Sequence, residues 1–312
     1  MNARQEALLE IGRYLQARHY RFVTITPESH RRIAGRDEHR EARDLRGIFG
    51  WSRPFHTDLL PGEILRLMEK ADCLESDHDL LRSSVRFSTA GDGLYVHSAF
   101  PTIGADAVFF GPDTYRFLNL LDREIDGATR AVDLGCGSGA GGLSIASRVE
   151  QIILVDINPR SLELAEVNAA LNAVGHAHFV RSDLLSEVPG EMDLIIANPP
   201  YLIDDHSRVY RHGGGSFGEA LSLRILREAL HRLTPGGRLV LYTGTAIVDG
   251  VDTFLEASRP ILEEAQGTFR YHEIDPDVFG EELDRLAYGR VDRLAVVGLI
   301  VEKRRGSSSS HP

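Results

Sequence analysis

Cysteine is scarce in this chain of 312 residues, which contains only Cys73 and Cys136. Two cysteines are too few for a disulfide framework or for a zinc site made of thiolates. The 13 histidines show neither HxxxH nor HxH spacing, so we assign no metal site. This composition fits a reducing compartment, and we expect the protein to act in the cytoplasm.

Long apolar runs are missing as well. No stretch approaches the roughly 18 residues that a membrane-spanning helix requires, so we expect no membrane association. Residues 1–6 show no signal-peptide core. With 42% hydrophobic and 26% charged residues, the chain has a globular composition and the length of one large or two ordinary domains. The net charge of −11 disfavours broad, sequence-independent phosphate binding, although it allows a local basic patch.

Residues 1–83 are predicted to form a mainly helical domain that recognises the substrate. Apolar side chains at helical spacing indicate an amphipathic helix over residues 2–18, and Thr26 is a suitable cap for a second helix. Two further helices are expected to begin at Pro61 and at Asp77. No nucleophile–base pair is evident here, so we place the chemistry farther along the chain.

Residues 30–46 are dense in charge. Six arginines alternate with four acidic residues in this stretch. Opposite charges three and four residues apart favour a solvated helix face. A surface that binds nucleic acid or another acidic partner is the alternative.

A change of composition near residue 84 marks a β-hairpin linker over residues 84–112. Two apolar runs flank a glycine turn at residues 91–93, a pattern typical of a hairpin. A further strand is expected at residues 107–110, followed by a helix that Asp113 or Thr114 caps.

Residues 113–305 alternate between apolar strands and helices, which predicts an α/β fold with a Rossmann-like, seven-stranded, mostly parallel sheet. The strands are expected at residues 131–134, 152–155, 178–180, 194–197, 239–242, 267–273 and 294–301. The helices are expected at residues 140–148, 159–172, 219–232 and 249–263. The Gly/Ser-rich tail, residues 306–312, is predicted to be disordered.

A glycine-rich loop follows the first of these strands. It reads Asp133-Leu134-Gly135-Cys136-Gly137-Ser138-Gly139. Glycines let a ligand approach the backbone, and the helix that follows offers free N–H groups. Residues 137–142 also satisfy GxGxxG, so a dinucleotide is an alternative ligand. An acid at Asp133 would repel a pyrophosphate and instead suits a ligand with a cationic group near the loop.

Two more acids lie at the ends of neighbouring strands. Asp156 ends the second strand, where a carboxylate can accept hydrogen bonds from both hydroxyls of a ribose. Asp183 follows the third strand and is a candidate acceptor for the amino group of adenine. A helix cap is the alternative role for each. Because the carboxyl ends of parallel strands share one edge of a sheet, we expect these acids to line a single site.

The fourth strand leads into Asn198-Pro199-Pro200-Tyr201. Proline fixes its own φ and restricts the residue before it, so this stretch is a stiff loop. The Asn198 side-chain oxygen and the Pro199 carbonyl are two acceptors that can hold both hydrogens of a planar amino group. Tyr201 can pack on the flat face of that group, and such a site works by orienting the nitrogen. A loop without a chemical role is the alternative.

Together these motifs resemble those of the class I S-adenosylmethionine-dependent methyltransferases, and of their amino-methylating members with the Asn-Pro-Pro-Tyr loop. The resemblance implies that S-adenosylmethionine is the cofactor, with its methionine part at the glycine loop, its ribose at Asp156 and its adenine at Asp183. The cofactor-binding residues that it implies are Asp133, Gly135, Cys136, Gly137, Gly139, Asp156, Ile157, Asp183, Leu184 and Asn198. The implied catalytic residues are Asn198, Pro199, Pro200 and Tyr201.

Within that group the chain is similar to the release-factor glutamine methyltransferases of the HemK/PrmC type. The similarity lies in Gly111-Pro112-Asp113-Thr114, in the helical N-terminal part and in the glycine-rich residues 213–218. The chain departs from that family where Gly111 and Tyr115 replace an arginine and a glutamate. RNA methyltransferases acting on adenine N6 or guanine N2 share the catalytic loop, and so do adenine-specific DNA methyltransferases.

We therefore predict an enzyme that methylates a planar amide or exocyclic amino nitrogen, with protein glutamine as the expected acceptor. RNA, or less readily DNA, is the alternative acceptor. Two alternative functions are a cofactor-binding protein without activity and, last, a dehydrogenase. The expected partner is a protein, such as a translation factor, or RNA. The residues expected to contact substrate or close the site are His206, Tyr210, Arg211 and His212. The sequence indicates no oligomeric state.

Overall fold

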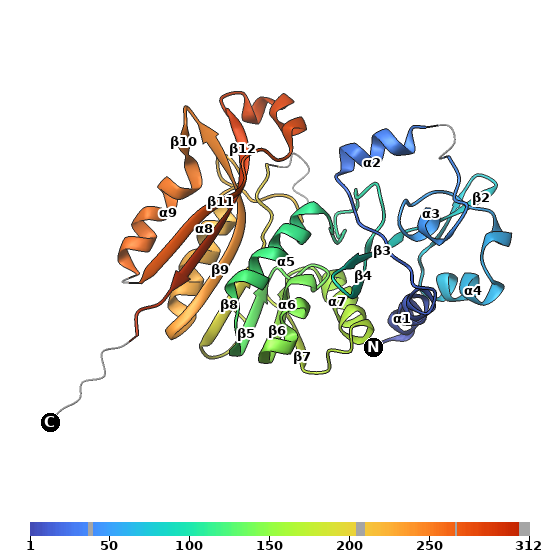
Figure 1. The fold of residues 1–312 in the computed structure, drawn as a ribbon, viewed down its shortest axis with the longest axis horizontal. Helices are drawn as coiled ribbons and strands as arrows, with labels where there is room; N and C mark the ends of the chain where they lie inside the picture. The colour runs from blue at the N-terminus through green and yellow to red at the C-terminus, as the bar shows by residue number, and fades with distance from the viewer. Residues whose placement is uncertain (37–39, 204–209, 266, 306–312) are drawn as a thin grey trace.

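The computed structural model describes residues 1–36, 40–203, 210–265 and 267–305, and its centre is one mixed sheet (Figure 1). Seven strands lie in the order β11-β12-β9-β8-β5-β6-β7, and the short β10 pairs with β9 in addition. The strands are β5 (Ala128–Leu134), β6 (Val149–Asp156), β7 (Ala177–Arg181), β8 (Met192–Ala197), β9 (Leu233–Val248), β10 (Val251–Asp252), β11 (Thr268–Asp275) and β12 (Arg293–Glu302). The pairs among β7, β6, β5, β8 and β9 are parallel, whereas β12 is antiparallel to both of its neighbours. The predicted fold class and all seven predicted strands of residues 113–305 are confirmed.

Helices cover both faces of this sheet, because parallel strands must be joined by crossovers. The helices on one face are α5 (Pro112–Glu124), α6 (Ala140–Ser144) with η3 (Ala146–Arg148), and α7 (Pro159–Leu171); those on the other are α8 (Ala220–Arg232) and α9 (Thr253–Glu264). The short helices η4 (Gly280–Asp284) and η5 (Leu286–Tyr288) lie between β11 and β12. The carboxyl ends of β5, β6, β7 and β8 consequently meet at one edge, where open α/β sheets bind their ligands.

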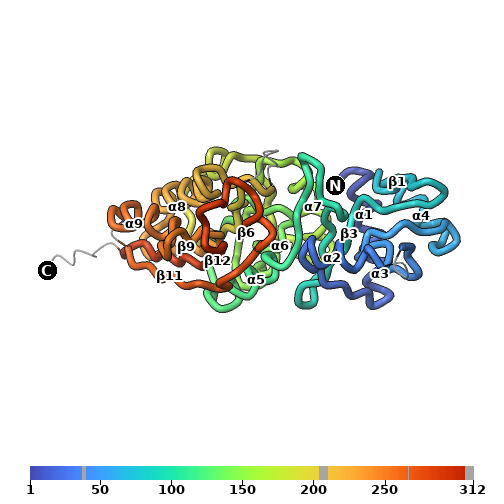
Figure 2. The backbone as a smooth tube through the Cα atoms, turned by 90° about the horizontal axis from the view of Figure 1, so that it is seen from above, coloured from blue at the N-terminus to red at the C-terminus, as the bar shows by residue number. Residues whose placement is uncertain are grey.

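The N-terminal part of the chain lies at one end of an elongated molecule, beside α7 (Figure 2). Its elements are α1 (Ala3–Gln16), α2 (Pro27–Ala34), α3 (Leu45–Phe49), η2 (Thr57–Leu59), α4 (Gly62–Lys70), β1 (Leu74–Asp77), β2 (Leu80–Ser83), β3 (Val85–Ala90) and β4 (Gly93–Ser98). The predicted hairpin is confirmed as β3–β4, and Thr26 caps α2 as predicted. The hydrophobic core of this part includes Leu164, Val167 and Leu171 of α7, so it packs directly on a helix of the central sheet.

Two local predictions in the N-terminal part are wrong. The helix expected at Asp77 is instead the β1–β2 hairpin, in which His78 takes a left-handed φ of 55° and Arg82 donates to Asp77 Oδ2 across the strands. The helix face expected over residues 30–46 is interrupted, because α2 ends at Ala34 and α3 begins only at Leu45. Residues 37–39 of that stretch, like the tail at 306–312, lie outside the described residues.

The strand expected at residues 107–110 does not form. Ser98 N–H donates to the Val108 carbonyl (3.1 Å), but Val108 N–H donates to Ser98 Oγ (2.9 Å). A side chain therefore takes the place of the backbone acceptor, and the ladder cannot continue. Among the described residues, no helix is both long and apolar enough to cross a bilayer.

Candidate active site

The glycine loop after β5 has the backbone that only glycine adopts freely. Gly135 and Gly137 have φ values of 67° and 55°, in the left-handed region. A Cβ atom at either position would meet nothing within 4 Å, so the loop borders open space. Gly139, with φ of 78°, precedes α6, and a Cβ there would press on Ala165. Gly139 therefore serves the start of α6 and does not line the pocket described below, unlike the other predicted residues of the loop.

Asp133 lies buried beneath this loop. Its Oδ2 accepts a hydrogen bond from Gly142 N–H at 2.7 Å, which ties the end of β5 to the first turn of α6. Burial raises the pKa of Asp133 to about 7, the Gly142 N–H opposes that rise, and the charge of Asp156 adds to it. Such a carboxyl is ready to ionise when a cation binds beside it.

Asp156 accepts a hydrogen bond on each carboxylate oxygen. Gly137 N–H donates to Oδ2 (2.9 Å) and Asn158 N–H donates to Oδ1 (2.8 Å). Asn158 caps α7, because its Oδ1 accepts from Arg160 N–H at 3.0 Å. Asn158, and not Asp156, is therefore the helix cap, so the alternative role of Asp156 is wrong. Each oxygen of Asp156 keeps acceptor capacity for a further donor.

Asp183 stands at the more open end of the site. Its Oδ2 accepts from Arg224 Nη2 of α8 at 2.9 Å, and both side chains are about half exposed. The apolar side chains of Leu184 and Ile157 lie along the same pocket. This arrangement offers a flat group apolar contact on its faces and an acceptor at its edge.

The loop after β8 brings the predicted catalytic residues to the centre of the site. Asn198 is half-buried, and its side chain makes no hydrogen bond within the part of the chain that the structure describes. Tyr201 is buried, and its hydroxyl donates to Asp113 Oδ2 at 2.5 Å. A Cβ on Gly244 of β9 would lie 2.0 Å from Tyr201 Cδ2, so this glycine leaves the space that the ring occupies.

A single pocket joins these features. It contains every predicted site residue except Gly139. The pocket residues that the sequence did not assign to the site include Pro27, Phe109, Asp113, Phe117, Asn158, Ser182, Leu202, Leu221 and Phe279. Tyr210 and Arg211 line it as expected, His212 does not, and His206 lies outside the described residues. Aromatic rings thus surround the side of the pocket next to Tyr201.

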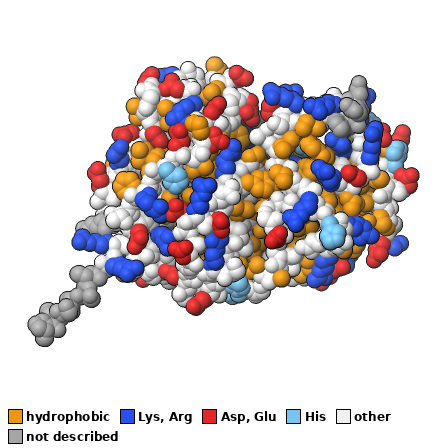
Figure 3. Space-filling view, viewed as in Figure 1, with side chains coloured by type: hydrophobic (Ala, Val, Ile, Leu, Met, Phe, Trp, Pro, Cys, Tyr) orange, Lys and Arg blue, Asp and Glu red, His pale blue; other side chains and the backbone are white. Residues whose placement is uncertain are grey.

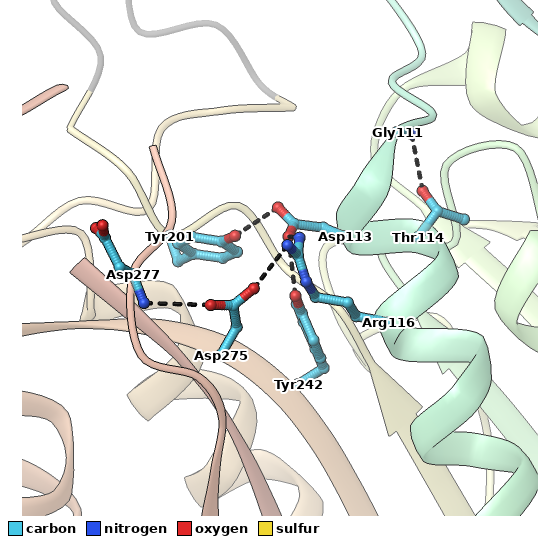
Figure 4. A network of polar contacts seen from close by, with 8 residues as sticks. All are labelled: Gly111, Asp113, Thr114, Arg116, Tyr201, Tyr242, Asp275 and Asp277. Carbon is cyan, nitrogen blue, oxygen red and sulfur yellow. Dashed lines mark hydrogen bonds and ion pairs between the residues drawn. The ribbon is translucent and has the colours of Figure 1, made fainter. Parts of the chain in front are cut away.

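Of the two capping side chains expected for α5, Thr114 takes part in the cap and Asp113 does not. The cap residue is Gly111, whose N–H donates to Thr114 Oγ1 at 3.2 Å, while Asp113 points inward (Figure 4). The sequence near Asp113 gave no signal for this, because the hydroxyls that bind it belong to Tyr201 and Tyr242, 88 and 129 residues away.

Residues 211–218 fold back over the loop that follows β8. Leu202 N–H donates to the Arg211 carbonyl (3.2 Å), and Gly213 N–H donates to the Leu202 carbonyl (2.9 Å). A Cβ on Gly213 would lie 2.7 Å from the Pro200 carbonyl oxygen, so the close approach requires glycine. Tyr288 of η5 adds support, since its hydroxyl accepts from Ile203 N–H at 2.8 Å.

Comparison with known proteins finds similarity to methyltransferases. Residues 112–258 match the methyltransferase small domain. A release factor glutamine methyltransferase of Borreliella burgdorferi is 32% identical over 134 residues, which cover 39% of this chain and 47% of that protein. A ribosomal RNA small subunit methyltransferase C of Chromohalobacter salexigens is 33% identical, over 45% of this chain and 36% of that protein.

Solved structures agree on the fold. A tRNA methyltransferase of Methanocaldococcus jannaschii superimposes with a TM-score of 0.50 at 15% identity, covering 72% of this chain and 58% of that one. The chain spans about half the length of the curated relatives it matches first.

Proposed function

Because residues 112–258 belong to the methyltransferase small domain family, we propose that this chain transfers a methyl group from S-adenosylmethionine to a planar nitrogen. The family consists of S-adenosylmethionine-dependent enzymes, so the predicted enzyme class and cofactor are confirmed for this domain. The observation that carries the proposed reaction is the Asn198 side chain, which lines the pocket without a hydrogen-bond partner among the described residues.

The residues of the pocket fit this cofactor. Asp133 suits a cationic group, the two oxygens of Asp156 suit the paired hydroxyls of a ribose, and Asp183 with Leu184 suits adenine. Glycines at positions 135 and 137 leave room for a ligand against the backbone. When bound, the cofactor supplies an electrophilic methyl group.

Asn198 and Pro199 orient the acceptor. The Asn198 side-chain oxygen and the Pro199 carbonyl accept the two hydrogens of the acceptor nitrogen, and the Tyr201 ring supports its planar group. Holding both hydrogens turns the nitrogen lone pair out of conjugation and toward the methyl donor. The new nitrogen–carbon bond would form as the methyl–sulfur bond breaks, and the nitrogen would lose one of its protons to water after the transfer. Orientation of this kind supplies much of the rate, so no strong base is required.

Protein glutamine is the acceptor that we propose first. Several relatives are release factor glutamine methyltransferases, with identities from 28% to 32%. A glutamine side chain ends in a planar amide with two hydrogens, which the two acceptors suit.

An exocyclic amino group of RNA is the second candidate, favoured by charge. Residues 18–53 contain nine arginines and five acids, a net charge of +4 in a chain of −11. Arg31 and Arg32 are exposed on α2, where basic side chains gather in Figure 3, and Pro27 of the same helix lines the pocket. Phe109 and Phe279, also in the pocket, offer stacking surfaces for a base.

The test uses isotope-labelled S-adenosylmethionine and lysate from cells that lack this protein. Wild type should label an acceptor, Asn198→Ala should abolish the label, and Asn119→Ala on the exposed face of α5 should not. Release of the label by protease supports glutamine. Release by nuclease supports RNA, and then replacing Arg31, Arg32 and Arg36 by glutamine should weaken the salt dependence of binding. Label that survives Asn198→Ala would contradict the proposed reaction.

A further inference from the structure

The carboxylate of Asp113 is the centre of a buried polar network that joins four elements (Figure 4). Tyr201 of the catalytic loop donates to Oδ2 at 2.5 Å, and Tyr242 of β9 donates to Oδ1 at 2.9 Å. Arg116 of α5 donates to Oδ1 at 3.1 Å and to Asp275 of β11 at 2.7 Å. Asp113 is only 6% exposed, so these donors replace water around its charge.

This network fixes one end of the Tyr201 ring, and packing fixes the other. The space left by Gly244 receives the ring carbons, while the hydroxyl is held on α5 by Asp113. Hydrogen bonds to a carboxylate are short and directional. Asp113 can therefore set the plane of the Tyr201 ring without touching the group that is methylated. Three hydrogen-bond donors already contact Asp113, so Asp113 need not touch the group that is methylated.

We propose that Asp113 is a positioning residue that fixes the Tyr201 ring, and through it the plane in which the acceptor group lies. This inference rests on the proposed function, since it presumes that a planar acceptor packs on Tyr201. A small displacement of the Tyr201 ring should lower the rate of methyl transfer, because the reacting atoms are no longer aligned. The affinity for the cofactor should not change, because the cofactor contacts remain.

The first test is Asp113→Asn, which keeps the shape but leaves one acceptor oxygen for three donors. The turnover of labelled methyl transfer to the acceptor fraction of the lysate should fall about tenfold or more. The Kd for S-adenosylmethionine should stay unchanged. Tyr201→Phe should cause a similar loss, and the double variant should lose no more than either single one.

A matched control is available on the same sheet. Tyr271 donates to Asp252 Oδ2 at 2.7 Å, in a tyrosine–aspartate pair outside the pocket. Asp252→Asn should lower stability without changing turnover. If Asp252→Asn slows transfer as much as Asp113→Asn, or if the losses of Asp113→Asn and Tyr201→Phe multiply, Asp113 acts only as a structural residue and the inference fails.

A second measurement does not depend on activity. In protein carrying ¹³C-labelled tyrosine, the ring signal that disappears in Tyr201→Phe identifies Tyr201. That signal should move in Asp113→Asn and stay in place in Asp252→Asn. An unmoved signal would overturn the inference even in an active enzyme. Conversely, a wild type that labels no acceptor would overturn the proposed function, while the ring signal still tests the link between Asp113 and Tyr201.

Discussion

Gly137 N–H donates a hydrogen bond to Asp156 Oδ2, with 2.9 Å between the two atoms. The contact joins the glycine loop after β5 to the end of β6, so the two motifs predicted to hold the cofactor are one rigid unit. Asn158 N–H holds the other oxygen of Asp156 at 2.8 Å. The carboxylate is thereby aimed before any ligand arrives, which lowers the entropic cost of binding.

Replacing Asp156 by asparagine should weaken S-adenosylmethionine binding. The amide has a single acceptor oxygen, so either the backbone contact or a ribose hydroxyl loses its partner. Each hydrogen bond to a charged group contributes about 1.5–3 kcal/mol, which predicts at least a tenfold increase in Kd by calorimetry.

Asp193→Asn is the control for that change. Asp193 also accepts two backbone hydrogen bonds, from Thr129 and Arg130 at 2.7 Å, but it lies near the amino end of β8. Its substitution should leave the Kd unaltered. Equal effects of the two substitutions would show that Asp156 matters only for folding.

The stability of the cofactor-free protein should depend on the ionisation of Asp133. Folding raises the pKa of Asp133 to about 7, above the ordinary value of about 4. Between these values the folded state binds more protons than the unfolded state, so the free energy of unfolding falls as pH rises. Asp133→Asn removes this term. Between about pH 5 and pH 8, its stability relative to wild type should rise by about 2–3 kcal/mol in urea unfolding.

The pH dependence of cofactor affinity gives an independent test of the ionisation of Asp133. The positive charge of S-adenosylmethionine favours ionised Asp133, so its affinity for wild type should increase as pH rises through about 7. The affinity of Asp133→Asn should lack that increase. Parallel pH profiles for the two proteins would exclude Asp133 as the titrating group.

Gly244→Ala should disable methyl transfer without disturbing the cofactor site. The new Cβ would lie 2.0 Å from Tyr201 Cδ2, so the ring must leave its present position. We expect the rate of methyl transfer to fall at least about tenfold, with an unchanged Kd for S-adenosylmethionine. Gly175→Ala is the control, because a Cβ there meets nothing within 4 Å. Full activity of Gly244→Ala would mean that the ring position is unimportant.

Gly213→Ala should affect stability and activity together. Its Cβ would lie 1.9 Å from the Gly218 carbonyl oxygen and 2.7 Å from that of Pro200. Overpacking of this kind costs about 1–3 kcal/mol, which thermal unfolding can measure as a lower Tm. Because Pro200 belongs to the loop that we propose to be catalytic, turnover should fall as well. Gly280→Ala, in open space, should change neither quantity.

The sequence by itself determined the elements whose signals are local. Alternation of strand and helix predicted the seven strands of the sheet, because side-chain periodicity depends on neighbouring residues only. The glycine loop and the Asn198–Tyr201 stretch could be predicted for the same reason. Glycine widens the range of its own backbone angles, and proline narrows it. Their meeting at one edge followed from the parallel order of the strands.

Only the tertiary structure decided what lies beside those motifs. Asp113 looked like a helix cap from its neighbours, but its partners Tyr201 and Tyr242 are 88 and 129 residues away. Ser98 replaces a backbone acceptor for Val108, which ends a strand that propensity favoured. Distant side chains bind Asp113, and a side chain ten residues away binds Val108 N–H. Each contact satisfies a buried polar group that has no water to bond to.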